Sequence, residues 1–172
     1  MNLEFKYLLE GNFHPDSRVW VYQSSRLFTV NEALQIEQML NQFTGNWLSH
    51  GVPVKGAAHL FFGQFVILLA DERATGVSGC STDSSVRVIK QIESTFGVNM
   101  FDRTTLAFFV KDGIQLLPMS QLQYAIDHGF LSGDTLYFNN VVQSKRELEN
   151  SWIIPLKNSW LAKRISFANS LS

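Results

Sequence analysis

Cysteine, net charge and long hydrophobic runs are all scarce in this sequence, and each shortage excludes a class of protein. The single cysteine, Cys80, rules out an intramolecular disulfide and a cysteine-based zinc site. A formal net charge of -1 creates no long-range field that would draw in nucleic acid or anionic lipid. The longest apolar run, residues 65–70, falls far short of the roughly 20 residues that a membrane-spanning helix needs.

The residues that are present are typical of one folded domain. Hydrophobic residues make up 45% of the 172 positions and charged residues 17%, a balance that favours a buried core over disorder. The basic pairs Lys145-Arg146 and Lys163-Arg164 are interpreted as parts of solvated faces. Residues 1–10 lack the features of a secretory signal. We therefore expect a single cytoplasmic domain over residues 1–172, with no cofactor, no membrane and no nucleic-acid partner.

Local patterns predict the elements of the first half of the chain. Residues 18–24 form a strand, and Thr29 with Glu32 makes a capping box that opens a helix ending near Gly51. Residues 55–62 and 64–71 form a hairpin around Gly63. A second helix begins at an N-cap and ends at Gly97. The candidate N-cap residues of that helix are Ser81, Thr82 and Asp83.

The second half continues with a hairpin and several short elements. Residues 105–111 and 114–117 flank Asp112-Gly113, a pair typical of a two-residue hairpin turn. A helix over 119–128 and a strand over 135–138 follow, and Ser144 with Glu147 repeats the capping pattern. Residues 151–167 are apolar enough that we expect them to pack on the domain or on a partner subunit, and the second arrangement would be a homodimer.

The order strand, helix, strand, strand, helix, strand predicts the fold class. We expect an α+β protein with a ferredoxin-like βαββαβ core and a mainly antiparallel sheet. A further hairpin strand and C-terminal helices would extend this core.

Several phrases resemble an uncharacterised bacterial family sometimes labelled "ABC transporter ATPase", over most of the chain from Arg18 to Trp160. The phrases are Val19-Trp20-Val21-Tyr22-Gln23-Ser24, Ser49-His50-Gly51, Gly79-Cys80-Ser81, Asp83-Ser84-Ser85, Phe138-Asn139-Asn140 and Leu148-Glu149-Asn150. The resemblance implies no established activity, cofactor or catalytic residue. The ATPase label is disfavoured, because such enzymes hold phosphates with a loop ending in Gly-Lys-Ser or Gly-Lys-Thr, and no Gly-Lys pair occurs here.

Residues 71–85 are the most site-like segment, since a buried strand leads through a Gly-containing loop into a helix start. Backbone N–H groups at a helix start favour an anion, and nearby hydroxyls add donors. The simpler interpretation is that these residues only cap the helix. The predicted anion-binding residues are Gly79, Ser81, Thr82, Ser84 and Ser85.

Cys80 is the candidate nucleophile, because a helix start lowers the pKa of a thiol. It would need a base, and His50 or His59 is the candidate. The alternative interpretation makes Cys80 a buried packing residue, and it makes His50 part of a helix C-terminus.

Carboxylates follow the same strand and open the next helix, as they do in some metal-dependent hydrolases. The candidates are Asp71, Glu72 and Asp83. Their spacing does not predict a metal site.

Two functions follow from these observations. The first is a non-catalytic binding or interaction module for a small molecule or a protein, since no complete catalytic constellation is visible. The alternative is a small hydrolase or transferase that uses Cys80 or a serine in residues 71–85.

Overall fold

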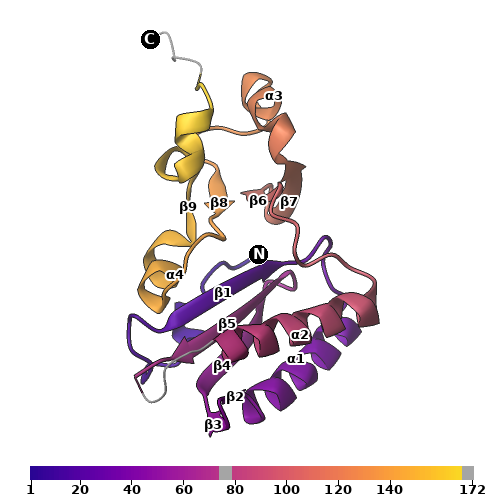
Figure 1. Ribbon diagram of the computed structural model, residues 1–172. Coiled ribbons are helices and arrows are strands. Elements are labelled where there is room, and N and C mark those ends of the chain that lie inside the picture. The colour runs from indigo at the N-terminus through magenta and orange to yellow at the C-terminus, as the bar shows by residue number, and fades with distance from the viewer. Residues whose placement is uncertain (74–78, 168–172) are drawn as a thin grey trace. The chain divides into compact units, whose positions relative to one another are not determined.

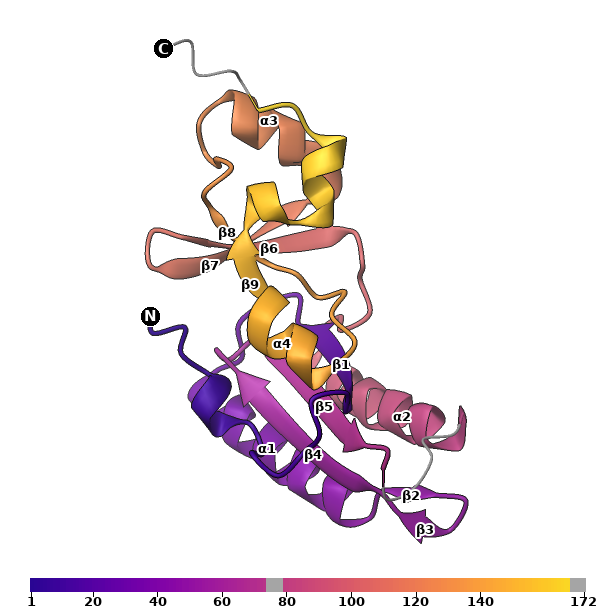
Figure 2. The same ribbon diagram turned by 90° about the vertical axis from the view of Figure 1, so that its left-hand side faces the viewer.

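The computed structural model describes residues 1–73 and 79–167, and at 79–81 it describes the backbone only. The chain divides into two compact units. The N-terminal unit contains Asn2–Asp102 and Asn140–Glu149, and the C-terminal unit contains Met1, Arg103–Asn139 and Asn150–Ser172. Figures 1 and 2 show the elements of each unit.

The N-terminal unit is built on a three-stranded antiparallel sheet in the order β1-β5-β4. Its strands are β1 (Arg18–Gln23), β4 (Lys55–Phe61) and β5 (Phe65–Asp71). All seven residues of β5 are buried, as expected for an apolar central strand. β4 and β5 form the predicted hairpin, with positive φ angles at Phe62 and Gly63.

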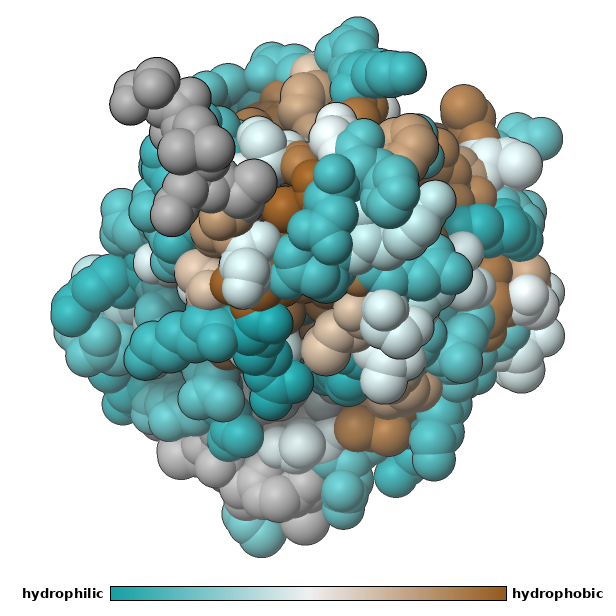
Figure 3. All heavy atoms as spheres, turned by 90° about the horizontal axis from the view of Figure 1, so that it is seen from above, coloured by the Kyte–Doolittle hydropathy of each residue, from teal (hydrophilic) through white to brown (hydrophobic). Residues whose placement is uncertain are grey.

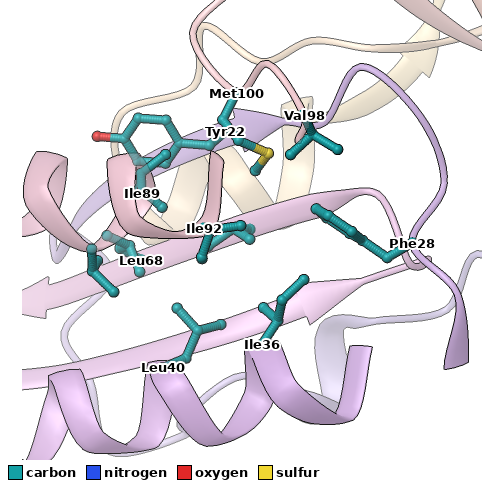
Figure 4. Close-up of a cluster of buried hydrophobic side chains, with 11 residues drawn as sticks. Tyr22, Phe28, Ile36, Leu40, Leu68, Ile89, Ile92, Val98 and Met100 are labelled. Atoms are coloured by element: carbon teal, nitrogen blue, oxygen red, sulfur yellow. The ribbon is translucent and has the colours of Figure 1, made fainter. Parts of the chain in front are cut away.

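Two long helices, α1 (Val30–Gly45) and α2 (Gly79–Phe96), cover one face of this sheet (Figure 1). The capping box at α1 is confirmed, because the Glu32 N–H donates to Thr29 Oγ1 and the Thr29 N–H donates to Glu32 Oε2. Figure 4 shows the resulting core between the helices and the sheet. Its labelled residues are Tyr22, Phe28, Ile36, Leu40, Leu68, Ile89, Ile92, Val98 and Met100.

The start of α2 and the end of α1 both correct the sequence prediction. α2 already begins at Gly79, so Ser81, Thr82 and Asp83 belong to its first turns. It ends before Gly97 as predicted, and the φ angle there is 64°. α1 ends at Gly45, well before Gly51, because Trp47 leaves the helix and closes over Gly56.

A small hairpin takes the place of the predicted last turns of α1. It consists of β2 (Leu48–Ser49) and β3 (Val52–Pro53). His50 and Gly51 form its turn, with φ angles of 50° and 79°. His50 therefore lies in a β-turn and is not the helix C-terminal residue that its sequence context predicts.

The other face of the sheet is partly covered by the N-terminal segment, which includes η1 (Lys6–Leu8). Phe5 is buried and its ring lies 5.6 Å from that of Phe61. At the β1 edge, the Val19 N–H donates to the Gln143 carbonyl, just before α4 (Lys145–Ser151). The Glu147 N–H donates to Ser144 Oγ, which confirms the cap predicted for this helix.

The C-terminal unit has a four-stranded antiparallel sheet in the order β7-β6-β8-β9. Its strands are β6 (Thr105–Val110), β7 (Gly113–Pro118), β8 (Leu136–Phe138) and β9 (Ile153–Pro155). The helical elements are η2 (Met119–Gln121), α3 (Leu122–Asp127), η3 (Leu156–Asn158) and η4 (Trp160–Arg164). Trp152, Leu156 and Leu161 are fully buried. The apolar C-terminal segment therefore packs within its own chain, which is the first of the two arrangements expected for it.

The β6–β7 turn differs by one residue from its prediction. Val110 is opposite Gly113, and the two central turn residues with positive φ are Lys111 and Asp112. This register places Leu106 opposite Leu117 on the buried face. A shift of one residue would turn one strand's apolar side chains to the wrong face, so core packing overrides the turn preference of Asp112-Gly113.

The chain is therefore an α+β protein with antiparallel sheets, as expected. The strand that follows α2 does not join the first sheet, because β6 pairs with β7 and β8 in the second. That a single domain spans residues 1–172 stays a prediction. Within the described residues, no helix combines the length and the apolar character needed to cross a bilayer.

Candidate functional site

Asp71 lies at the end of β5 and is the centre of a charged cluster. Its side chain is 2% exposed, and the Arg73 guanidinium donates to both carboxylate oxygens, at 3.1 and 2.8 Å. Lys55 Nζ lies 3.3 Å from Oδ2, and the His14 N–H donates to the same oxygen at 3.1 Å. These hydrogen bonds, that of Arg73 above all, hold the pKa of the Asp71 carboxyl well below its usual range in spite of burial.

A carboxylate held in this way has few lone pairs left for a ligand. A hollow of about 260 Å³ lies beside the cluster and is also lined by the exposed Glu72. Asp83 is exposed on α2. Among the described residues, no group of three or more His, Cys, Asp and Glu side chains could hold a metal ion. Asp71 therefore has a structural role, because it holds Arg73, Lys55 and the His14 backbone at the end of the sheet.

The predicted anion-binding residues at the start of α2 are only partly described. Gly79 has no side chain, and the side chains of Cys80 and Ser81 lie outside the described part of the chain. Ser85 is buried, and its hydroxyl donates to the Thr82 carbonyl at 2.6 Å, so that donor is used inside the helix. Ser84 lines a separate hollow of about 310 Å³ between α1 and α2.

His59, a candidate base, lies on the side of the sheet away from α2. Its neighbours Ala58 and Leu60 pack into the core that α1 and α2 cover, so the alternation of a strand directs His59 to the other face. There His59 Nε2 lies 3.0 Å from Glu10 Oε1, and the imidazole stacks on Phe61. The structure thus does not bring His59 to the α2 start.

Glu10 and Lys145 complete this polar cluster, and neither is among the site residues predicted from the sequence. Burial alone would raise the pKa of Glu10, but the hydrogen bond and charge of His59, with the charge of Lys145, lower it. Lys145 corrects the prediction of a solvated face, because it is 7% exposed and its ammonium donates to the Glu10 and Phe13 carbonyls at 2.9 and 3.2 Å. No sequence signal separates Lys145 from an ordinary surface lysine, since its partners are carbonyls of a segment more than 130 residues earlier.

The open edge of β4 borders a groove with a volume of about 310 Å³. Within the described residues β4 pairs with β5 alone, so the far edge of β4 carries no further strand. Residues of α1 form one wall of the groove, and Leu8 of η1 contributes to the other. Figure 2 shows α1 alongside β4. The lining residues are Leu8, Glu37, Leu40, Asn41, Ala58, His59, Leu60 and Phe61.

The rim of this groove is apolar apart from the carboxylate of Glu37. Leu8 is 47% exposed, and Leu34, one helical turn before the groove residue Glu37, is 55% exposed. Glu37 is exposed and has no ion-pair partner among the described residues. β4 itself carries its one charged residue, Lys55, at its first position, and Lys55 is engaged by Asp71. The edge thus lacks the charges that usually block strand addition.

Among the predicted site residues, the structure places His59 in this groove, Asp71 in the charged cluster and His50 in the β2–β3 turn. Comparison with protein-family models, with curated proteins and with solved structures finds no match.

Proposed function

We propose that this protein is a non-catalytic interaction module that binds an extended segment of a partner protein along the free edge of β4. The observation that carries the proposal is a β4 edge that no other described strand pairs with, bordered by a groove lined by Leu8, Leu40 and Leu60. An added strand would satisfy the backbone groups of that edge, and its alternate side chains would fall on the two walls.

A slim extended segment fits this groove better than a second copy of the chain does. α1 and η1 contribute residues on either side of the β4 edge, so the edge is recessed. In a second copy β4 would be recessed between the same walls, and the walls would meet before the strands reached the pairing distance of about 4.8 Å. Glu37 on one wall favours a segment with a basic residue among its apolar ones.

The hydrolase or transferase alternative has less support. It needs a base beside residues 71–85. Of the two candidates, His59 is directed to the opposite face and bonded to Glu10, and His50 is exposed in the β2–β3 turn. For the fold, the order β1-β5-β4 with α1 between β1 and β4 supports a split βαβ unit. We propose that it represents three of the four strands of a ferredoxin-like sheet.

The test uses a phage-displayed library of short random peptides selected on the whole protein. The enriched peptides should alternate apolar residues and carry Lys or Arg. On binding, those amides between Ala58 and Phe61 that point away from β5 should exchange with deuterium more slowly, because the added strand gives them new partners. Leu8→Asp and Glu37→Arg should each weaken the best peptide roughly tenfold in fluorescence anisotropy.

Matched controls lie next to the tested positions. Tyr7 and Gln38 are exposed neighbours of Leu8 and Glu37 that do not line the groove. Tyr7→Asp and Gln38→Arg should leave the affinity within about twofold of wild type. If no peptide is enriched, if the controls weaken binding as much as the groove variants, or if light scattering shows a dimer that Leu8→Asp dissociates, the proposed partner segment is wrong.

A further inference from the structure

The C-terminal unit contains a cavity of about 470 Å³ that is independent of the β4 groove. It lies between the β6–β7 hairpin and the segment from α3 to Leu131. Phe108, Ala125 and Leu131 are buried in its floor. A volume of this size is within the range of small-molecule sites.

The cavity exists because the core of this unit ends before the hairpin does. Leu106 and Phe108 pack into the cluster beneath α3, and Val110 follows on the same face of β6. The residue opposite Val110 is Gly113, which has no side chain to fill the space. α3 has only six residues, so it covers only part of this face.

Two polar side chains line this mainly apolar hollow and have no partner among the described residues. Gln115 is exposed at the edge of the cavity, and because it is opposite the buried Phe108, the register places its side chain on the face that carries the core. Lys111 lies at the turn, and the neighbouring Asp112 is bound to the N-terminal ammonium of Met1. A free ammonium and a free amide therefore border an apolar wall.

The mouth of the cavity is apolar on its other side. Phe130 lines the cavity and is 68% exposed, although a phenylalanine gains most when it is buried. Figure 3 shows apolar residues in patches between polar ones. A ligand in the cavity would cover Phe130 and pair with the two polar groups.

We infer that this cavity binds a small molecule with an apolar body and one anionic group, such as an aryl or alkyl carboxylate or sulfonate. The apolar body lies on Phe108, Leu131 and Phe130. The anionic group accepts hydrogen bonds from the Lys111 ammonium and the Gln115 amide. This class of ligand is the one that satisfies both parts of the lining at once.

The test compares two fluorescent probes that share an apolar body. 8-Anilinonaphthalene-1-sulfonate carries an anionic group, and N-phenyl-1-naphthylamine does not. Both should bind the whole wild-type protein with one site. Lys111→Met should weaken the sulfonate about three- to fivefold, the size of an exposed charge contact, and leave the neutral probe unchanged. Val110→Phe should block both probes, because it fills the space opposite Gly113.

Two further variants keep the result decisive. Lys90 is exposed on α2 in the other unit, and Lys90→Met should not change either affinity. Leu34→Ser removes an exposed apolar side chain of the N-terminal unit and should not change them either. The inference is overturned if Leu34→Ser abolishes binding, if Lys111→Met weakens both probes equally, or if neither probe binds to the wild-type protein. A thermal melt of Val110→Phe that matches wild type shows that lost binding is not unfolding.

Discussion

The two compact units differ in how they use their polar side chains. In the N-terminal unit, Asp71, Lys55, Glu10 and Lys145 each bond to a group from a distant part of the chain, and together they hold the N-terminal segment against the sheet. In the C-terminal unit, Lys111 and Gln115 line a cavity without a partner in the described residues.

This difference shows why charge at the end of a buried strand is a poor guide to chemistry here. Of the residues that looked catalytic in the sequence, His59 is paired with Glu10, and Asp71 is paired with Arg73, Lys55 and the His14 N–H, so their interaction free energy contributes to the fold. Glu37 on α1 and Lys111 and Gln115 on the β6–β7 hairpin have no such partner among the described residues. We therefore expect Glu37, Lys111 and Gln115 to contact a ligand or a partner.

The largest expected change in stability comes from substitutions in the two cores, and it tests whether these cores open separately. Phe108→Ala should cost about 3–5 kcal/mol of unfolding free energy and Ile89→Ala about 2–5 kcal/mol, because each leaves a cavity in a fully buried cluster. Urea unfolding measures the totals. Hydrogen exchange should show faster opening mainly in the unit that carries the substitution. Equal acceleration in both units would show one cooperative core and remove the distinction drawn between them.

A smaller effect should come from the charged cluster of the N-terminal unit. Asp71→Asn should cost about 1–3 kcal/mol, because the groups donating to a buried carboxylate lose their charged acceptor. The folded pKa of Asp71 lies below its unfolded value. Its contribution is therefore fully present above about pH 4 and is lost as the pH falls through the folded pKa.

Acid unfolding monitored by circular dichroism checks the sign of this effect. Below about pH 4 the stability of wild type should fall more steeply than that of Asp71→Asn. Glu72→Gln is the matched control, since Glu72 is exposed beside Asp71. Parallel curves for wild type and Asp71→Asn would contradict the assigned role.

The smallest expected effect tests one exception within the N-terminal unit. Ser17 is 2% exposed and its hydroxyl has no hydrogen-bond partner among the described residues, whereas the buried Ser85 hydroxyl donates to the Thr82 carbonyl. Ser17→Ala should change stability by less than about 0.5 kcal/mol, and Ser85→Ala should cost about 0.5–1.5 kcal/mol. A thermal melt of both variants decides, and a larger loss for Ser17→Ala would point to a partner for its hydroxyl.

Much of the fold could be predicted from local patterns. The Thr29 and Ser144 caps, the β4–β5 hairpin and the end of α2 at Gly97 all form as the sequence indicates. Each depends on residues close in the chain, so a short segment of sequence contains all of the interacting groups. The predicted end of α1 was wrong, because the helix stops where Trp47 becomes buried against Gly56 and Ala70, and this is a long-range contact.

The site could be predicted far less well than the fold. The sequence predicted His59 and Asp71 as candidate site residues because of their chemistry. It did not predict their partners, which are Glu10 for His59 and Arg73 for Asp71, or the charge of Lys145 beside Glu10. An ion pair between residues 10 and 59 leaves no trace in either local segment. The β4 groove and the cavity near Lys111 are spaces between elements, which no single stretch of sequence specifies.

The sequence by itself determined the α+β class, most element types and the local caps, because these follow from periodicity and from hydrogen bonds over a few residues. Only the tertiary structure decided that β6 joins a second sheet, that Lys145 is buried, and that no described strand other than β5 pairs with β4. Those outcomes depend on which strands pair and which faces are covered. Such pairing is fixed by the packing of residues far apart in the chain.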